Sequence, residues 1–429
     1  MDDLLTSYSA AIEALFARTT SGTKFGLERT EAILARLGSP HKKLAAIHVA
    51  GTNGKGSVVA AAEALLSAPG RKVGRYTSPH LIDFRERITV GSEPIPEKAV
   101  LEFLEKWIPA AEEMGATFFE LTTALAFDWF SRQEVDIAVI ETGLGGRLDS
   151  TNVLTPRVAT VTSIGLDHTD LLGDTLEAIA REKAGIFKRG VPAIIGESAP
   201  KVRSLLVDCA KEAHADPIVL IDDRYRISDV AVSASGTSFT LGTGSKTQRV
   251  TTPLIGAFQA RNTVIALATV AALGEEYLPE SAEISKKLTS LFLPARFQRH
   301  GKFIFDVAHN PDGARAVAAS ISALNPPAPR TALVAVLADK DWKGIVLALA
   351  PAVDRFVFTN APSAPLERRW DASQAQAFAI SQGLESRLEP NLDTALEGAQ
   401  KGAETVLVTG SFHTVGDVMS RLQVSPFAA

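Results

Sequence analysis

Residues 48–57 read His-Val-Ala-Gly-Thr-Asn-Gly-Lys-Gly-Ser, a glycine-dense stretch between two apolar runs. Residues 44–50 before it are mostly apolar, and residues 58–66 after it are apolar with helical spacing. This pattern predicts a strand, a phosphate-binding loop and the N-terminus of a helix. Backbone N–H groups and the helix dipole bind phosphate in such loops, and Lys55 adds a positive charge for the β- and γ-phosphates. The predicted phosphate-binding residues are Gly51, Thr52, Asn53, Gly54, Lys55, Gly56 and Ser57.

Length and composition indicate a globular protein with two domains. The chain has 429 residues, more than one ordinary hydrophobic core contains. Its 46% hydrophobic and 22% charged residues are typical of soluble proteins, and a net charge of −5 provides no basic surface for nucleic acid or anionic lipid. Cys209 is the only cysteine, which fits a reducing compartment. With no visible secretory signal or membrane-spanning run, we expect a cytoplasmic enzyme.

The N-terminal part of the chain alternates short apolar runs with helical patterns. Helices are expected at 120–130 and 175–187. Strands buried on both faces of a parallel sheet are expected at 136–140, 157–163, 191–196 and 217–222. In residues 223–254, Ser, Thr and Gly alternate with Val, Ile and Phe, which predicts a small antiparallel addition. The fold class is therefore α/β, with a P-loop NTPase-like, mostly parallel domain over residues 1–293.

The alternation of strands and helices resumes after Pro294. Further strands are expected at 303–307, 333–337, 356–359 and 406–409, with helical patterns between them. A block of this size can form its own doubly wound sheet, so we predict a Rossmann-like domain over residues 294–429. The Ala-Pro-Ser-Ala-Pro segment at 361–365 is expected to be a mobile loop.

Polar residues follow the predicted buried strands of the first domain. Glu141 ends one strand and precedes a glycine-rich turn, while Asp167 and His168 follow the next. Ligands of open α/β sheets bind at the carboxyl ends of the strands, and a carboxylate oxygen suits Mg²⁺. The alternative for each is an ordinary solvent-facing residue. For Lys183, helical spacing alone favours a solvated lysine.

The second domain has a comparable turn. Asp306, His309 and Asn310 follow the first predicted strand, and Pro311 can begin the next helix. Asn310 is a good N-cap for that helix, and capping alone would explain it. The density of polar groups at another strand end favours a ligand-facing turn.

Five motifs in order resemble one family, the folylpolyglutamate synthase/dihydrofolate synthase branch of the Mur ligase superfamily. They lie at 51–57, 76–81, 141–152, 182–186 and 306–311. The resemblance implies a monomeric, ATP-dependent ligase that joins L-glutamate to dihydropteroate, tetrahydrofolate or both. The acceptor carboxylate would attack the γ-phosphate of ATP, and the amino group of glutamate would then displace phosphate from the acyl phosphate.

The resemblance also implies roles for individual residues. Lys55 contacts the ATP phosphates, Glu141 binds one of two Mg²⁺ ions, His168 binds the second, and Lys183 is carbamylated so that it offers oxygen to metal. Either Ser57 or Ser78 binds the first Mg²⁺, and the motifs leave both open. The implied nucleotide contacts outside the loop are Asn262, Arg296, Asp306 and His309. The implied folate-side residues are Phe25, Gly26, Leu27, Thr117, Phe119 and Asp149, with core packing as the alternative for Leu27 and Phe119.

Some positions depart from the family pattern. Phe258, Val307 and Ala338 replace residues usual in the family, and 361–369 lacks its usual pattern, which leaves the glutamate contacts unassigned.

Three other functions are alternatives. A Mur ligase for a UDP-linked substrate needs a domain before the P-loop, and only 50 residues precede Gly51. A P-loop ATPase switch would hydrolyse ATP without an acceptor. A dead-site folate-binding scaffold is disfavoured because every implied catalytic residue is present.

Overall fold

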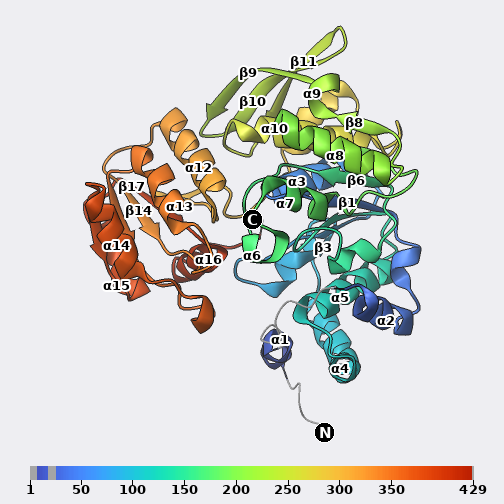
Figure 1. Ribbon diagram of the computed structural model, residues 1–429, viewed down its shortest axis with the longest axis horizontal. Coiled ribbons are helices and arrows are strands. Elements are labelled where there is room, and N and C mark those ends of the chain that lie inside the picture. Colours follow the sequence, from blue (N-terminus) through green and yellow to red (C-terminus); the bar gives the residue numbers. More distant parts are fainter. Residues whose placement is uncertain (1–6, 18–25, 428–429) are drawn as a thin grey trace.

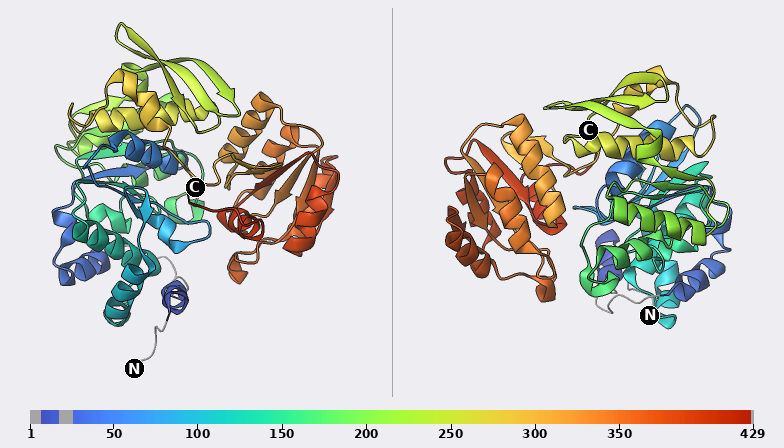
Figure 2. Two further views of the ribbon diagram at one scale, coloured as in Figure 1. Left: turned by 180° about the vertical axis from the view of Figure 1, so that it is seen from behind. Right: turned by 45° about the horizontal axis from the view of Figure 1, so that its top comes forward.

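The computed structural model describes residues 7–17 and 26–427 and contains two α/β lobes, each built around its own sheet (Figure 1). The N-terminal lobe is coloured blue to yellow and the C-terminal lobe orange to red, and the views of Figure 2 also separate them. This confirms the predicted α/β class. In the described part of the chain, no helix is long and apolar enough to cross a membrane. Phe25, a predicted folate-side residue, lies outside the described residues.

An eight-stranded sheet forms the centre of the N-terminal lobe. Its strands are β1 (Ala46–Ala50), β2 (Val73–Tyr76), β3 (Ile88–Val90), β4 (Glu93–Pro94), β5 (Ile137–Glu141), β6 (Val158–Val161), β7 (Ala193–Ile195) and β8 (Ile218–Leu220). The order is β4-β3-β2-β5-β1-β6-β7-β8, with β3 and β4 antiparallel at one edge and the other strands parallel. β1 lies between β5 and β6, so the loops after these three strands meet at one edge of the sheet.

Helices cover both faces of this sheet, which explains why β1 and β5 are buried along their whole length. The helices are α1 (Tyr8–Phe16), α2 (Glu28–Arg36), α3 (Lys55–Leu66), α4 (Glu97–Glu113), α5 (Phe118–Arg132), α6 (Thr169–Leu172), α7 (Leu176–Ala184), α8 (Pro200–Glu212), α9 (Ile221–Arg224), α10 (Phe258–Ala271) and α11 (Ile284–Leu288). α3 and α10 share one core, whereas α1, α2, α4 and α5 share a second on the other face. α7 and α8 pack on the sheet beside the second core.

The predicted antiparallel addition is confirmed as a three-stranded sheet. Its strands are β9 (Arg226–Ser233), β10 (Gly236–Thr243) and β11 (Lys246–Thr252). Figure 1 places it above α10, at the side of the molecule that faces α12. β10 and β11 contact α10 and α11, and β9 contacts α12 of the other lobe. The addition therefore touches both lobes.

The C-terminal lobe has a six-stranded sheet in the order β12-β13-β17-β14-β15-β16. Its strands are β12 (Gln298–His300), β13 (Phe303–Phe305), β14 (Arg330–Val334), β15 (Arg355–Phe358), β16 (Ser386–Leu388) and β17 (Thr405–Thr409). Only β12 is antiparallel. The helices are α12 (Pro311–Leu324), α13 (Trp342–Leu349), α14 (Ala372–Ser381), α15 (Leu392–Gln400) and α16 (Phe412–Arg421). α12, α13 and α14 pack on one face and α15 and α16 on the other, which confirms the doubly wound prediction.

Short 3-10 helices complete the fold. They are η2 (Pro40–Lys42), η3 (Phe84–Arg87), η4 (Ser150–Val153), η5 (Ser281–Glu283), η6 (Ala350–Ala352) and η7 (Leu366–Arg368). Of these, η3 lies beside the candidate site and begins with a capping box at Asp83.

Several predicted strands are longer than the strands of the structure, and two of them show the reason. The strand placed at 333–337 is β14, which ends at Val334 because its pairing with β17 stops there; residues 335–337 are buried without belonging to the sheet. The run at 217–222 is strand only in β8, and α9 begins at Ile221. In both places apolar residues continue past the end of the strand, so a prediction from apolar sequence alone puts the end of the strand in the wrong place. The domain boundary between residues 293 and 294 stays a prediction.

Candidate functional site

The glycine-rich loop has the backbone geometry of a phosphate-binding loop. Gly51 and Gly54 have φ angles of 149° and 89°, which L side chains rarely adopt. A Cβ on Gly51 would lie 1.9 Å from Oγ1 of Thr162, and a Cβ on Gly54 would lie 2.7 Å from Oδ1 of Asn262. The loop therefore packs tightly against β6 and α10 and turns directly into α3, whose N-terminal N–H groups are free to bind an anion.

Lys55 and Glu141 lie together at the start of α3. Nζ of Lys55 donates to the carbonyl oxygens of Gly51 and Thr52, at 3.1 and 3.3 Å, and lies 3.9 Å from Oε1 of Glu141. Burial raises the pKa of the Glu141 carboxyl, and the positive charges of Lys55 and Arg296 oppose this shift. The backbone N–H of Ser78 lies 3.4 Å from the other Glu141 oxygen. A buried carboxylate thus faces the predicted phosphate site.

Lys183 is not the solvated lysine that its spacing suggests. Its side chain is buried, and Nζ donates to the carbonyl oxygen of Gly51 at 2.8 Å. Burial, with the nearby charge of Lys55, lowers the pKa of Lys183 to about 7. A large fraction of this amine is therefore neutral near physiological pH and able to react as a nucleophile.

A second polar cluster joins the two lobes. Nζ of Lys340, in the C-terminal lobe, lies 2.5 Å from Oδ1 of Asp167 and 3.3 Å from Nε2 of His168. Nε2 of His309 lies 3.3 Å from Oδ2 of Asp167. Burial opposes ionisation of Asp167, but His309 and Lys340 hold its pKa below the usual range. Burial and the charge of Lys340 lower the pKa of His168 to about 4, so its imidazole is neutral and can bind metal.

The turn after β13 reaches the phosphate loop. Nδ2 of Asn310 donates to Oδ1 of Asn53 at 3.1 Å, while Oδ1 of Asn310 caps α12 by accepting from the N–H of Gly313. Asn310 therefore has both roles, as helix cap and as a contact between lobes. Asp306 has a different place: its carboxylate accepts from the N–H groups of Phe297 and Ala308 and so fixes the backbone on either side of β12 and β13.

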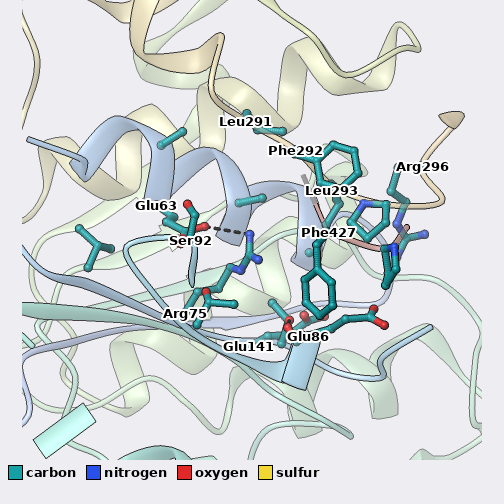
Figure 3. A pocket seen from close by; sticks show the side chains of 18 of the residues that line it. Glu63, Arg75, Glu86, Ser92, Glu141, Leu291, Phe292, Leu293, Arg296 and Phe427 are labelled. Carbon is teal, nitrogen blue, oxygen red and sulfur yellow. Dashed lines mark hydrogen bonds and ion pairs between the residues drawn. The ribbon is translucent and has the colours of Figure 1, made fainter. Parts of the chain in front are cut away.

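Asn262 and Arg296 flank the same region. Asn262, on α10, approaches Gly54 and donates to Oε1 of Gln259. The guanidinium of Arg296 lies 5.6 Å from the ring centre of Phe412, in the connection between the lobes. Arg296 and Glu141 line one cavity of about 220 Å³, which runs along α3 between the lobes (Figure 3). Asn262 thus lies beside the phosphate loop, and Arg296 lies in the cavity between the lobes.

The predicted folate-side residues gather at the start of α5. Thr117 caps α5, and the ring of Phe119 packs against Gly143, where a Cβ would lie 2.4 Å from the ring. Asp149 accepts from the N–H groups of Leu144 and Thr151, which holds the turn after β5. Leu27 precedes α2, which packs on α5, and Gly26 has a φ of 122°. The folate-side role of these residues stays a prediction.

The predicted metal ligands do not form a preassembled set of acidic and imidazole groups. Among residues 7–17 and 26–427, no cluster of three or more His, Cys, Asp or Glu side chains could hold a metal ion. Ser57 is buried in the first turn of α3, and neither its hydroxyl nor that of Ser78 has a protein partner in the described part. The candidate donors are therefore the hydroxyls of Ser57 and Ser78 together with Glu141, His168 and Lys183. The phosphates of a nucleotide would have to complete the coordination.

Comparison with known proteins identifies the family. Residues 49–270 match the Mur ligase middle domain, and residues 295–412 match the Mur ligase glutamate ligase domain. The chain is 33% identical to the dihydrofolate synthase/folylpolyglutamate synthase of Bacillus subtilis over 98% of this chain and 100% of that protein. It is 37% identical to the Escherichia coli protein of the same name, over 97% and 94%. The chain belongs to the dihydrofolate synthase/folylpolyglutamate synthase family of Mur ligases.

Solved structures agree with this family. E. coli FolC in complex with DHPP and ADP is 34% identical, with a TM-score of 0.85 over 99% of each chain. A bifunctional folylpolyglutamate synthase/dihydrofolate synthase with Mn, AMPPNP and L-glutamate bound is 32% identical, with a TM-score of 0.83 over 97% of this chain and 98% of that one. The predicted enzyme class, an ATP-dependent acid–amino-acid ligase, is confirmed at the level of the family.

Sequence reasoning left out part of the contact between the lobes. The sequence places Asp167 and Asn310 only at the ends of their own strands, and it gives no prediction for Lys340. Asp167 and Lys340 are 173 residues apart, so no local sequence pattern predicts that they pair.

Proposed function

We propose that this protein joins the amino group of L-glutamate to the carboxylate of dihydropteroate, of tetrahydrofolate, or of both, with ATP as the energy source. The carboxylate attacks the γ-phosphate and becomes an acyl phosphate; glutamate nitrogen then attacks the acyl carbon, phosphate leaves, and an amide forms. The observation that carries this proposal is the convergence of Lys55, Glu141 and Lys183 on the glycine-rich loop. Positioning and neutralisation of phosphoryl charge are the main sources of catalysis in such a transfer.

The residues of the chain divide these tasks. The loop N–H groups and Lys55 bind the phosphates. Asn262 contacts the nucleotide beside the phosphate loop, and Arg296 contacts it from the cavity between the lobes. His309 and Lys340 bring positive charge from the C-terminal lobe. Asp306 holds the backbone next to Arg296 and so acts as a positioning residue. A monomeric state and a cytoplasmic location remain predictions of the sequence.

The donor set fits hard divalent cations of the Mg²⁺ type. Glu141 and the hydroxyl of Ser57 or Ser78 would hold one ion near Lys55, and His168 would hold another. When bound, such ions neutralise charge on the transferring phosphoryl group. Because Lys340 now lies beside His168, its ammonium must move before that imidazole can bind metal.

Carbamylation of Lys183 forms part of the proposal. The neutral amine adds to CO₂ and releases one proton, which leaves a carboxylate-like group where the amine was. Two observations support it: the side chain is buried against the phosphate loop, and its pKa is lowered to about 7, so the reactive amine is present at neutral pH. Without carbamylation, an ammonium here would repel both Lys55 and a metal ion.

The ligase activity is tested by ATP-dependent phosphate release with Mg²⁺ and L-glutamate. Dihydropteroate is supplied in one reaction and tetrahydrofolate in another, with each component omitted in turn. We expect turnover only in complete mixtures, and the active acceptor then defines the substrate. Phosphate release without acceptor or glutamate would instead indicate an ATPase switch.

Carbamylation is tested by ¹³C NMR with ¹³C-bicarbonate. We expect a carbamate signal that disappears in Lys183→Ala and persists in Lys188→Ala. Burial also lowers the pKa of Lys188, to about 8, but its amine bonds to the carbonyl oxygens of Asn152 and Leu154 and not to the phosphate loop. Lys183→Ala should also lose activity, with partial rescue by formate or acetate. An unchanged signal or full activity in Lys183→Ala would refute the carbamate.

A further inference from the structure

The two lobes also touch at Gly416, within α16. Gly416 is buried, and a Cβ added to it would lie 2.2 Å from the carbonyl oxygen of Leu81 in the N-terminal lobe. This oxygen belongs to the backbone, so it cannot rotate aside as the end of a side chain could. Any larger residue at position 416 would therefore force the helix and the loop of the other lobe to move apart.

The loop at this contact follows β2 and passes the phosphate site. We call residues 77–82 the β2 loop. Near its start, the N–H of Ser78 lies 3.4 Å from Oε2 of Glu141, and near its end the N–H of Leu81 donates to Oε2 of Glu86 at 2.9 Å. Only two residues separate Ser78 from Leu81, so a displacement of Leu81 is transmitted to the N–H that faces Glu141.

The side chain of Leu81 is held by the C-terminal lobe as well. It packs against the hydrophobic core that α15 and α16 form on one face of the C-terminal sheet, a core that includes Val415 and Val418. Leu81 also lines the cavity between the lobes, together with Phe412 at the start of α16. Both the backbone and the side chain of Leu81 therefore dock on α16.

This docking point is separate from the Asp167–Lys340 pair. Asp167 follows β6, whereas Leu81 follows β2, and two strands, β5 and β1, lie between β2 and β6 in the sheet. On the other lobe, Lys340 precedes α13, which packs on the opposite face of the C-terminal sheet from α16. The contact at Gly416 thus acts on a part of the site that the ion pair does not reach.

We propose that Gly416 is a positioning residue, which lets α16 dock on the β2 loop and so places Ser78 beside Glu141. This inference rests on the proposed function, in which Glu141 belongs to the phosphate site and Ser78 is a candidate donor there. Docking at Gly416 couples the position of the C-terminal lobe to the geometry of that site. Phosphoryl transfer reaches its full rate only in the docked arrangement, because a misplacement of about 1 Å is enough to slow such a reaction.

The test compares Gly416→Ala with Gly398→Ala as the matched control. Gly398 lies in α15, on the same face of the C-terminal sheet, and the nearest atom to its Cβ position is Nη1 of Arg387 at 3.8 Å, so alanine fits there. Alanine favours a helix more than glycine does at both positions. A difference between the two variants therefore reports the contact with Leu81.

Hydrogen exchange without ligands gives the first readout. We expect Gly416→Ala to raise the exchange rates of the amides of residues 78–83 about 10-fold or more, and Gly398→Ala to leave them unchanged. In the phosphate-release assay, kcat of Gly416→Ala should fall about 10- to 100-fold. The Kd for ATP, measured by calorimetry, should stay unchanged, because the glycine-rich loop belongs to the other lobe and makes its own turn into α3.

Leu81→Ala tests the same contact from the loop, and it decides the question if Gly416→Ala does not fold. It should reproduce the faster exchange and the lower kcat. The double variant should lose no more than the weaker single variant, because both substitutions break one contact. Additive losses, unchanged exchange and kcat in Leu81→Ala, or equal changes in Gly398→Ala would overturn the inference. If the unsubstituted protein turns over neither acceptor, the proposed function fails, whereas the exchange rates still test the docking.

Discussion

Asp167 and Lys340 connect the two lobes through a nearly buried ion pair, with 2.5 Å between Oδ1 and Nζ. The exposed fractions of the two side chains are 9% and 6%. His309 approaches the same carboxylate from the C-terminal lobe, so two cations converge on one anion across the cleft. Since buried pairs are weakly screened by solvent, this cluster favours a closed arrangement of the lobes.

Lys340→Met should loosen that arrangement. It leaves Asp167 buried without its main partner in the closed form, a cost of about 3 kcal/mol or more that opening of the cleft relieves. We expect a larger radius of gyration by small-angle scattering and a fall in kcat/KM of about 10- to 100-fold. Lys343→Met is the control, because Lys343 is an exposed lysine in the first turn of α13, three residues after Lys340. An unchanged radius and activity would show that the ion pair does not hold the lobes together.

Glu141→Gln should abolish turnover without unfolding the protein. The substitution keeps the shape and removes the charge that faces Lys55, so we expect phosphate release to fall about 100-fold or more. Tm should not fall, because burial already disfavours the ionised carboxylate, as its raised pKa indicates. Glu177→Gln, an exposed acid paired with Lys201, should remain active. Activity of Glu141→Gln within a fewfold of the unsubstituted protein would remove Glu141 from the phosphate site.

Lys183 gives a pH dependence of stability whose sign can be worked out. Its pKa is about 7 in the folded protein and near 10.5 in the unfolded chain, so between these values the unfolded state binds more protons. The free energy of unfolding, relative to Lys183→Met, should therefore rise with pH above 7 by about 1.4 kcal/mol per unit. Denaturant titrations in CO₂-free buffer from pH 7 to 9 measure this difference. A flat difference would mean that the folded protein keeps the lysine charged.

Gly51→Ala should destroy the phosphate loop. The new Cβ would lie 1.9 Å from Oγ1 of Thr162 at a φ of 149°, so the loop must move. We expect loss of ATP binding by calorimetry and a lower Tm. The control is Gly190→Ala. Gly190 also has a positive φ, but nothing lies within 4 Å of its Cβ position, so the substitution strains only the backbone conformation. If both variants bind ATP equally well, close packing of Gly51 is not required.

The sequence predicts those parts of the site that lie on one continuous segment. The phosphate loop and Glu141 follow buried strands directly, so periodicity and loop composition were sufficient to find them. Lys183 needed the family resemblance, because its helix pattern alone favours solvent, and its burial depends on the fold around Gly51. The misplaced strand at 333–337 shows the same limit: apolar sequence predicts burial, whereas backbone pairing decides where β14 ends.

The contacts across the cleft could not be predicted from the sequence. Asn53 and Asn310 are 257 residues apart, and each has a sufficient local explanation, as loop residue and helix cap. Only the folded chain reveals which side chains of the two lobes meet across the cleft.

The acyl-phosphate route is tested most directly by isotope transfer. The acceptor is prepared with ¹⁸O in both carboxylate oxygens and incubated with the protein, ATP, Mg²⁺ and L-glutamate, and the released phosphate is analysed by mass spectrometry. Attack of the carboxylate on the γ-phosphate predicts one ¹⁸O atom in each phosphate and one in the amide product. Phosphate without ¹⁸O would contradict the account, because it would mean that water, and not the acceptor, takes the phosphoryl group.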